Sequence, residues 1–251
     1  MKEIDVTLNM ADFTPNFWCD YWENPMGKSK KDPDSSCLLL QEYHSKLWSR
    51  VLPINQKLEL KKGHGSNYLT WKNFRFGSDS IIVSFRYEKL KSFIERVKDE
   101  VVDYKTFIQD YVKISYTIGG FIIFPKKKGG INQSRGCNPF IRDRFDLTLE
   151  CIRRYYNREF SPLFNILNDN KDFFDLFVDF RGYVDFFFLQ DLVSEDYKSV
   201  NFWIGKGDLK ENPFPSTVDE YLLLISKELK FVEKRNHRIN EFIQNPNKKL
   251  Y

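Results

Sequence analysis

Residues 131–156, INQSRGCNPFIRDRFDLTLECIRRYY, combine five arginines with an apolar stripe of helical spacing. The apolar residues that fall on one helical face are Ile141, Phe145, Leu149, Ile152 and Tyr156. Asn138 followed by Pro139 is typical of a helix start, because the Asn oxygen can accept a backbone N–H and proline has no N–H to lose. We therefore expect a helix over residues 139–157 with one buried face.

Charged residues line the edge of this stripe. Asp146 and Glu150 are like charges one turn apart, which is unfavourable unless a cation such as Arg135 or Arg153 lies between them. One interpretation is therefore a salt-bridge network that fixes the helix against the loop before it. The other interpretation is a site for an anion.

The anion interpretation rests on the start of the helix, where free amides and the helix dipole favour phosphate. Guanidinium groups match phosphate in shape as well as in charge. The predicted phosphate-binding residues are Asn132, Arg135, Arg142, Arg144 and Arg153. The basic run at 126–128 lies just upstream and could cover such a pocket, although a solvated turn is the simpler interpretation.

Candidate catalytic residues are few. His44 could act as a general base, because its side chain normally titrates near neutral pH, and the alternative is a packed, hydrogen-bonded histidine. The Asp146 and Glu150 pair is the second candidate for acid–base chemistry. None of the three histidines stands four to six residues after an arginine, so the signature of HEPN ribonucleases is absent.

Two further patterns are weaker. Asp34, Glu59 and Lys61 formally match the PD-(D/E)xK nuclease pattern, but Asp34 lies in a lysine-rich loop and chance explains the match. The last predicted helix carries a basic stretch that could contact nucleic-acid phosphates or could simply be a solvated face. Its residues are Lys230, Lys234, Arg235 and Arg238.

The whole pattern predicts an α+β fold, with a mixed strand and helix N-terminal half packed on a mainly helical C-terminal half. The predicted helices are 36–49, 89–111, 139–157 and 216–243, with a further start at Ser161–Pro162 and a buried helix, or a pair broken near Gly182, at 172–193. The predicted strands are 57–60, 68–76, 80–84 and 114–125. Inside the last strand Gly119 and Gly120 indicate a bulge or a close backbone approach.

Length and composition bound the remaining possibilities. We expect a single domain over 1–251, with a loosely structured segment at 1–35, a mixed part at 36–125 and a mainly helical part at 126–251. The formal net charge of +4 is too small to indicate a nucleic-acid protein by itself, and the four cysteines have neither metal-ligand spacing nor a disulfide pattern. No apolar run is long enough for a membrane span, so we expect a cytoplasmic protein with no membrane partner. No metal site is predicted and the cofactor is unknown.

Several blocks resemble an uncharacterised family of bacterial proteins over about residues 114–205. They are YTIGGFIIFP, INQSRG, DRFDLTLECIRRYY and FFDLFVDFRGYVDFFFLQDLVSEDY, with weaker likeness in YHSKLW and SDSIIVSF. In size and low-GC character the chain also resembles lactococcal abortive-infection proteins of the AbiB type. That second resemblance implies an antiphage effector that acts on RNA, directly as a ribonuclease or through a partner. The alternative is a noncatalytic sensor or protein-interaction module in phage defence, with a phage or host protein as its trigger.

Overall fold

The computed structural model describes residues 3–17, 32–63, 68–82, 91–126 and 130–245, and for residues 91–94 it describes the backbone alone. The fold combines helices with one small antiparallel sheet of strand order β1-β2-β3-β4, so the predicted α+β class is confirmed. The strands are β1 (Lys61–Lys62), β2 (Leu69–Trp71), β3 (Phe74–Ser80) and β4 (Phe121–Pro125). The helices of the first half are α1 (Pro33–Ser36), α2 (Leu38–Trp48), α3 (Lys91–Glu100), α4 (Tyr104–Ser115) and the 3-10 turn η2 (Ile118–Gly120).

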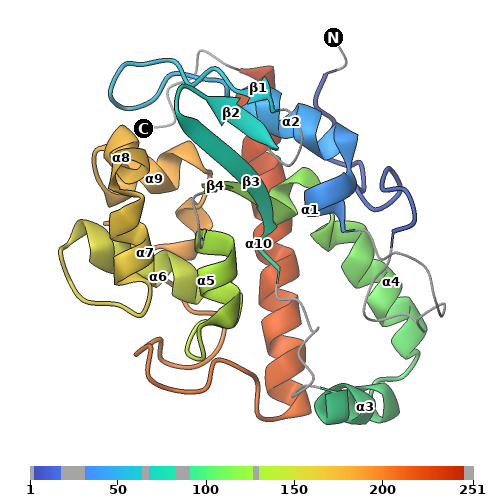
Figure 1. Cartoon of the computed structure of the whole chain (residues 1–251). Coiled ribbons are helices and arrows are strands. Elements are labelled where there is room, and N and C mark those ends of the chain that lie inside the picture. The colour runs from blue at the N-terminus through green and yellow to red at the C-terminus, as the bar shows by residue number, and fades with distance from the viewer. Residues whose placement is uncertain (1–2, 18–31, 64–67, 83–90, 127–129, 246–251) are drawn as a thin grey trace.

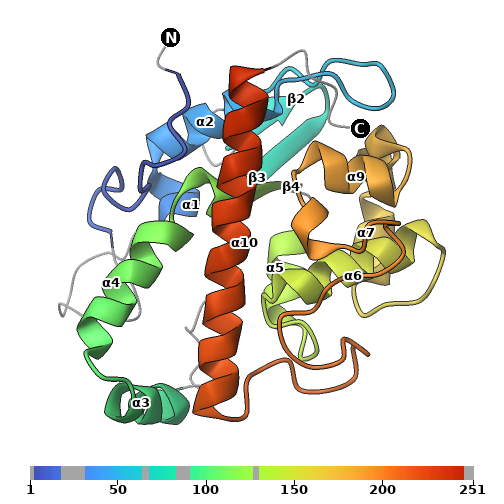
Figure 2. The same ribbon diagram turned by 180° about the vertical axis from the view of Figure 1, so that it is seen from behind.

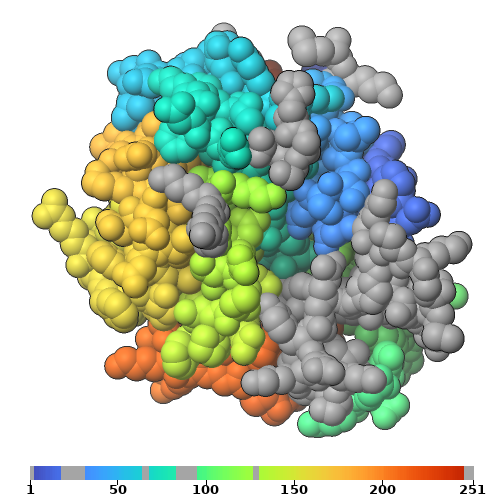
Figure 3. Space-filling model, in the orientation of Figure 1, coloured from blue at the N-terminus to red at the C-terminus, as the bar shows by residue number. Residues whose placement is uncertain are grey.

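The second half is helical in every described element. These elements are α5 (Ile131–Cys137), α6 (Phe145–Tyr156), α7 (Phe164–Asp169), α8 (Lys171–Phe174), η3 (Asp175–Phe177), α9 (Phe180–Phe186), η4 (Gln190–Leu192) and α10 (Val218–Gln244). Helix α10 runs the length of the molecule, with α3 and α4 on one side of it and α5, α6, α7 and α9 on the other (Figures 1 and 2). In the space-filling view, which has the orientation of Figure 1, other elements hide most of α10 (Figure 3). Among the described residues, no helix combines the length and the apolar character that crossing a bilayer requires.

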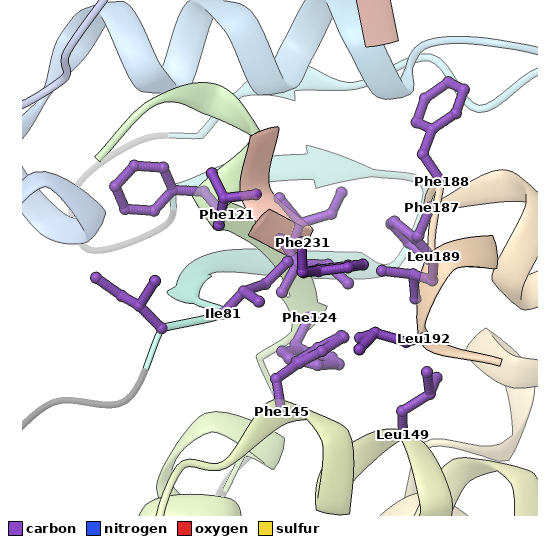
Figure 4. Packing of buried hydrophobic residues seen from close by; sticks show 14 of the residues in the cluster. Ile81, Phe121, Phe124, Phe145, Leu149, Phe187, Phe188, Leu189, Leu192 and Phe231 are labelled. Carbon is purple, nitrogen blue, oxygen red and sulfur yellow. The ribbon is translucent and has the colours of Figure 1, made fainter. Parts of the chain in front are cut away.

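One aromatic core joins the two halves of the chain. Phe124 on β4 faces Phe145 and Leu149 of α6, while Phe187 and Leu189 approach from the end of α9 (Figure 4). All five side chains are fully buried. The same cluster of buried residues extends from Met10 to Ile239. The described part of the predicted loose segment at 1–35 therefore includes core residues, and residues 18–31 lie outside the described part of the chain.

The glycine pair marks a close approach between η2 and α10, as the sequence indicates. A Cβ atom at Gly119 would lie 2.7 Å from the carbonyl oxygen of Val232, and the Gly119 N–H donates to Asn236 Oδ1 at 2.8 Å. Only 121–125 of the predicted strand is extended, because α4 continues to Ser115 and η2 follows it.

The predicted helix at 139–157 begins late. Asn138 is the C-cap of α5, which the sequence analysis did not predict, and its side chain accepts the Phe140 N–H in a turn. Arg142 and Asp143 then adopt positive φ angles of 44° and 63°, which no α-helix allows. Helix α6 therefore starts only at Phe145. Asn138 and Pro139 thus follow the end of α5, although the same pair of residues is typical of a helix start.

Other predicted element boundaries differ from the observed ones for similar reasons. The predicted strand 68–76 is a hairpin that turns at Lys72, where φ is 51°, and the predicted helix 89–111 divides at Asp103, where φ is 54°. The buried segment 172–193 breaks at Val178 instead of near Gly182, which lies inside α9. The helices predicted at 36–49 and 216–243 are confirmed within two residues at every end.

Candidate functional site

A chain of hydrogen bonds runs from the core to the surface between α2 and β3. Trp48 Nε1 donates to His44 Nδ1 at 2.8 Å, His44 Nε2 lies 3.1 Å from Ser78 Oγ, and Ser78 Oγ donates to Asp34 Oδ1 at 2.7 Å. His44 and Trp48 share one face of α2 because they are four residues apart. Ser78 lies on β3, and Asp34 lies in the short helix α1, which packs on that strand.

These hydrogen bonds determine the protonation state of His44. Because Nδ1 accepts from Trp48, the ring proton of the neutral form lies on Nε2 and is donated to Ser78. Burial, together with the positive charge of Arg235, lowers the pKa of His44 to about 3. His44 is 0% exposed, so both ring nitrogens are committed to protein partners in the interior.

Carboxyl groups cluster around Asp34, where the series of hydrogen bonds reaches the surface. Burial and the charges of Asp32 and Asp79 raise the pKa of Asp34 well above its usual value. Burial raises the pKa of Asp79 to about 6, even though the guanidinium of Arg135 opposes the rise. Tyr68 lies beside them, its ring 6.1 Å from that of His44, and its hydroxyl oxygen is buried without a hydrogen-bond partner. Raised carboxyl pKa values together with buried polar atoms are typical of binding or catalytic sites.

Arg135 belongs to the interior. It is 0% exposed, and its guanidinium donates to the Asp79 carboxylate, the Ser80 carbonyl, the Asp143 carbonyl and Thr148 Oγ1. These partners fix α5 against β3 and α6. The prediction that Arg135 binds a phosphate from solvent is therefore not supported by its position, because its donors already have acceptors.

Arg144 and Asp146 form a second interior pair. Arg144 is 3% exposed and Asp146 is 0% exposed, and the guanidinium bonds to both oxygens of the carboxylate. Arg144 also donates to the carbonyl oxygens of Ile204 at 2.7 Å and Pro213 at 3.0 Å, while Asp146 accepts the Trp203 N–H at 2.9 Å. Because one guanidinium holds Ile204 and Pro213 together, the chain between them forms a closed loop.

Glu150 is shared by two arginines. Arg153 donates to both of its oxygens at 2.8 and 2.9 Å, and Arg154 donates to Oε1 at 2.7 Å. Arg153 also reaches Glu159 at 3.2 Å. These ion pairs join the end of α6 to Glu159 in the segment after the helix, whereas the sequence interpretation placed a network between the helix and the loop before it. Asp146 and Glu150 each have their own cations.

The other predicted residues are placed separately. Asn132 donates to the Ser78 carbonyl at 2.9 Å, and Arg142 is half-buried in the turn before α6. In the last helix Arg235 is fully buried, whereas Lys234 and Arg238 both pair with Asp191. Residues 127 and 128 of the basic run lie outside the described residues. The five predicted phosphate ligands thus do not share one set of partners.

Sequence reasoning missed Ser78, Asp79 and Tyr68. A signal was present, because YHSKLW holds His44 and Trp48, and SDSIIVSF holds Ser78 and Asp79. The structure joins these two short blocks through the His44–Ser78 contact. Asp34 was noted for a different reason, and Glu59 of that nuclease pattern is exposed beside Lys57.

The part of the chain that the structure describes holds no cluster of side chains suited to metal binding, and its cysteines are free thiols. No group of three or more His, Cys, Asp or Glu side chains is placed there to hold a metal ion. Cys37, Cys137 and Cys151 carry free thiols, and Cys19 lies outside this part.

Comparison with known proteins identifies a family without an assigned activity. A family model described as a family of unknown function, DUF6994, matches residues 5–239, and the chain therefore belongs to that family. No curated protein and no solved structure matches the chain.

Proposed function

We propose that this member of the DUF6994 family is a noncatalytic sensor or protein-interaction module that works in the cytoplasm in phage defence. The observation that carries the proposal is that the atoms predicted to move protons are bonded within the protein. His44 uses both ring nitrogens, and Asp146 and Glu150 each use both carboxylate oxygens. A general base must instead come within hydrogen-bond distance of its substrate.

The positions of the arginines favour the same choice over an effector that acts on RNA. Phosphate binding needs guanidinium donors that are open to solvent. Arg135 and Arg144 are at most 3% exposed and donate to carboxylates and backbone carbonyls. Opening Arg144 would leave the buried Asp146 carboxylate unpaired, which costs about 3–5 kcal/mol, and opening Arg135 would remove the cation that pairs with Asp79.

The polar site at α1 and β3 has the chemistry to receive a cation. Asp34 and Asp79 have raised pKa values because burial and neighbouring carboxylates disfavour their charged forms. A positive group from outside would relieve this repulsion and release protons. The partner that fits this site is a protein that presents a lysine or arginine side chain, and the same charges disfavour a phosphate.

The binding test uses calorimetry with a short oligoarginine peptide and an uncharged peptide of equal length. We expect the cationic peptide to bind with proton release at about pH 7.5 and to bind more weakly at about pH 5, where Asp79 is protonated. Asp34→Asn should weaken binding and keep the fold, because the amide retains an acceptor for Ser78. Equal heats for the two peptides would contradict the proposed site.

The catalytic alternative is tested with the same preparation. Labelled RNA is incubated with the protein, with and without Mg²⁺, and the proposal expects no turnover. Cleavage that disappears in His44→Gln or Glu150→Gln, with folding intact, would refute the noncatalytic role. Arg135→Ala is a poor choice for this purpose, because it removes four buried contacts as well as a charge.

The proposed role in phage defence is tested separately in cells. Phage defence enters the proposal through the resemblance to abortive-infection proteins, so expression of the chain should reduce plaque formation by some phages. Unchanged plaque counts across a broad panel would remove defence from the proposal and leave the binding site to be judged on its own.

A further inference from the structure

Two polar atoms in the middle of the core have no hydrogen-bond partner. They are Arg235 Nη2 on α10 and Tyr183 Oη on α9, and both residues are 0% exposed. Buried polar groups in native proteins are almost always bonded to protein, water or an ion. Both atoms are therefore free to bind an occupant that the protein chain itself does not supply.

The remaining donors of Arg235 are fixed in place. Nε donates to the Phe187 carbonyl at 3.0 Å, and Nη1 donates to the carbonyls of Gly119 and Phe121, both at 2.7 Å. A guanidinium has five N–H groups, so these three bonds leave the two on Nη2. The carbonyls come from η2, β4 and the end of α9, and together they hold the group rigidly. The centre of the guanidinium also lies 5.7 Å from the Trp48 ring.

The charge of Arg235 is not balanced by a carboxylate. No ion pair joins it to any Asp or Glu among the described residues, whereas Arg135 and Arg144 have such partners. Burial lowers the pKa of Arg235 to about 9, and the nearby charge of Arg50 acts in the same direction. A buried cation that is bonded only to neutral carbonyls remains electrostatically costly.

Tyr183 brings a donor to the same region. Its ring packs on Phe187 with 4.9 Å between centroids, and the carbonyl of Phe187 is the one that holds Arg235 Nε. Burial raises the pKa of Tyr183, while the charges of Arg235 and Arg135 oppose the rise. The hydroxyl is thus a neutral O–H group that lies in the field of two buried cations.

We propose that Arg235 Nη2 and Tyr183 Oη hold a small monovalent anion, such as chloride, inside the protein. Two N–H donors and one O–H donor would bind it, and its charge would balance that of Arg235. A water molecule could accept two of these hydrogen bonds but would leave the charge unbalanced. The site uses neither Asp34 nor Asp79 of the surface site, although the charge of Arg235 also acts on His44.

Chloride should stabilise the folded protein through this site. A ligand that binds only the folded state lowers the unfolding constant by 1 + [L]/Kd, so a Kd of about 20 mM gives about a tenfold decrease at about 200 mM chloride. Urea unfolding is followed at fixed ionic strength while gluconate replaces chloride. Tyr183→Phe should lose most of this response, and Tyr68→Phe is the matched control, because it removes another buried, unpartnered tyrosyl oxygen elsewhere.

Crystals grown with bromide give the second readout, which does not depend on any variant. We expect an anomalous peak within hydrogen-bond distance of Arg235 Nη2 and Tyr183 Oη. A water molecule there without an anomalous signal would overturn the proposal. An equal chloride response in Tyr183→Phe and in the wild type would overturn it as well.

Discussion

Replacing Arg144 with methionine tests whether its role is structural. The change keeps most of the side-chain volume but removes the cation beside Asp146, which is 0% exposed, and the donors to Ile204 and Pro213. Breaking a buried ion pair costs about 3–5 kcal/mol, so we expect a loss of about 4 kcal/mol. With an m-value of about 3 kcal/mol/M, the urea midpoint should fall by more than about 1 M.

Two controls make this result specific. Arg158→Met alters an exposed arginine and should change stability by less than about 0.5 kcal/mol. Adding Asp146→Leu to Arg144→Met removes the stranded carboxylate and should recover most of the loss. Trypsin should also cleave after Lys206 or Lys210 faster in Arg144→Met, because Arg144 closes that loop. A loss no larger than that of Arg158→Met would refute the structural role of Arg144.

Three further substitutions test other parts of the structure by urea unfolding. Val178→Gly should stabilise the protein by about 1 kcal/mol, because an exposed β-branched residue holds φ 71° and ψ −57° there; a loss of stability would contradict the strain. Gly119→Ala should lower the free energy of unfolding by about 1–3 kcal/mol because its Cβ atom would meet backbone atoms of α10. Gly77→Ala is the control, because the nearest atom to a Cβ there is 3.8 Å away. Equal costs at the two positions would contradict the close approach at Gly119. His44 stays neutral in the folded protein but protonates near pH 6.5 in the unfolded chain. Its contribution to the free energy of unfolding is therefore complete above about pH 6.5 and is lost as the pH falls towards 3. The stability difference between wild type and His44→Gln should therefore shrink by about 3 kcal/mol from about pH 6.5 to 4, and a constant difference would contradict a depressed pKa.

Features that depend on local spacing could be predicted from the sequence. Helix α2 and helix α10 follow from apolar residues at helical intervals, and α10 begins with a true cap, since Thr217 Oγ1 accepts the Glu220 N–H. The close approach at Gly119 follows from a glycine pair inside a buried segment. These signals lie within a few residues of the feature that they predict.

The start of α6 could not be predicted in the same way. Asn138 followed by Pro139 fits a helix start and also fits the turn after α5, and local sequence does not distinguish the two. The choice depends on Arg142 and Asp143, which adopt left-handed conformations while Asp143 reaches back to Arg135. That contact exists only in the folded protein.

The same limit applies to the candidate site. From sequence, the arginines could be paired only with carboxylates a few positions away, so they looked available to a phosphate. The structure gives Arg135 a partner 56 residues away, at Asp79, and gives Arg144 a partner 69 residues away, at Pro213. Burial of His44 by α2 and β3 is likewise a tertiary effect that composition does not reveal.

The most direct test of a noncatalytic His44 is ¹⁵N NMR of its imidazole ring. The Trp48 and Ser78 contacts predict a neutral ring with its proton on Nε2 and ¹⁵N shifts that stay constant from about pH 7 to pH 4. A proton on Nδ1, or protonation of the ring within that range, would contradict the hydrogen-bond chain and return His44 to the list of possible catalytic bases.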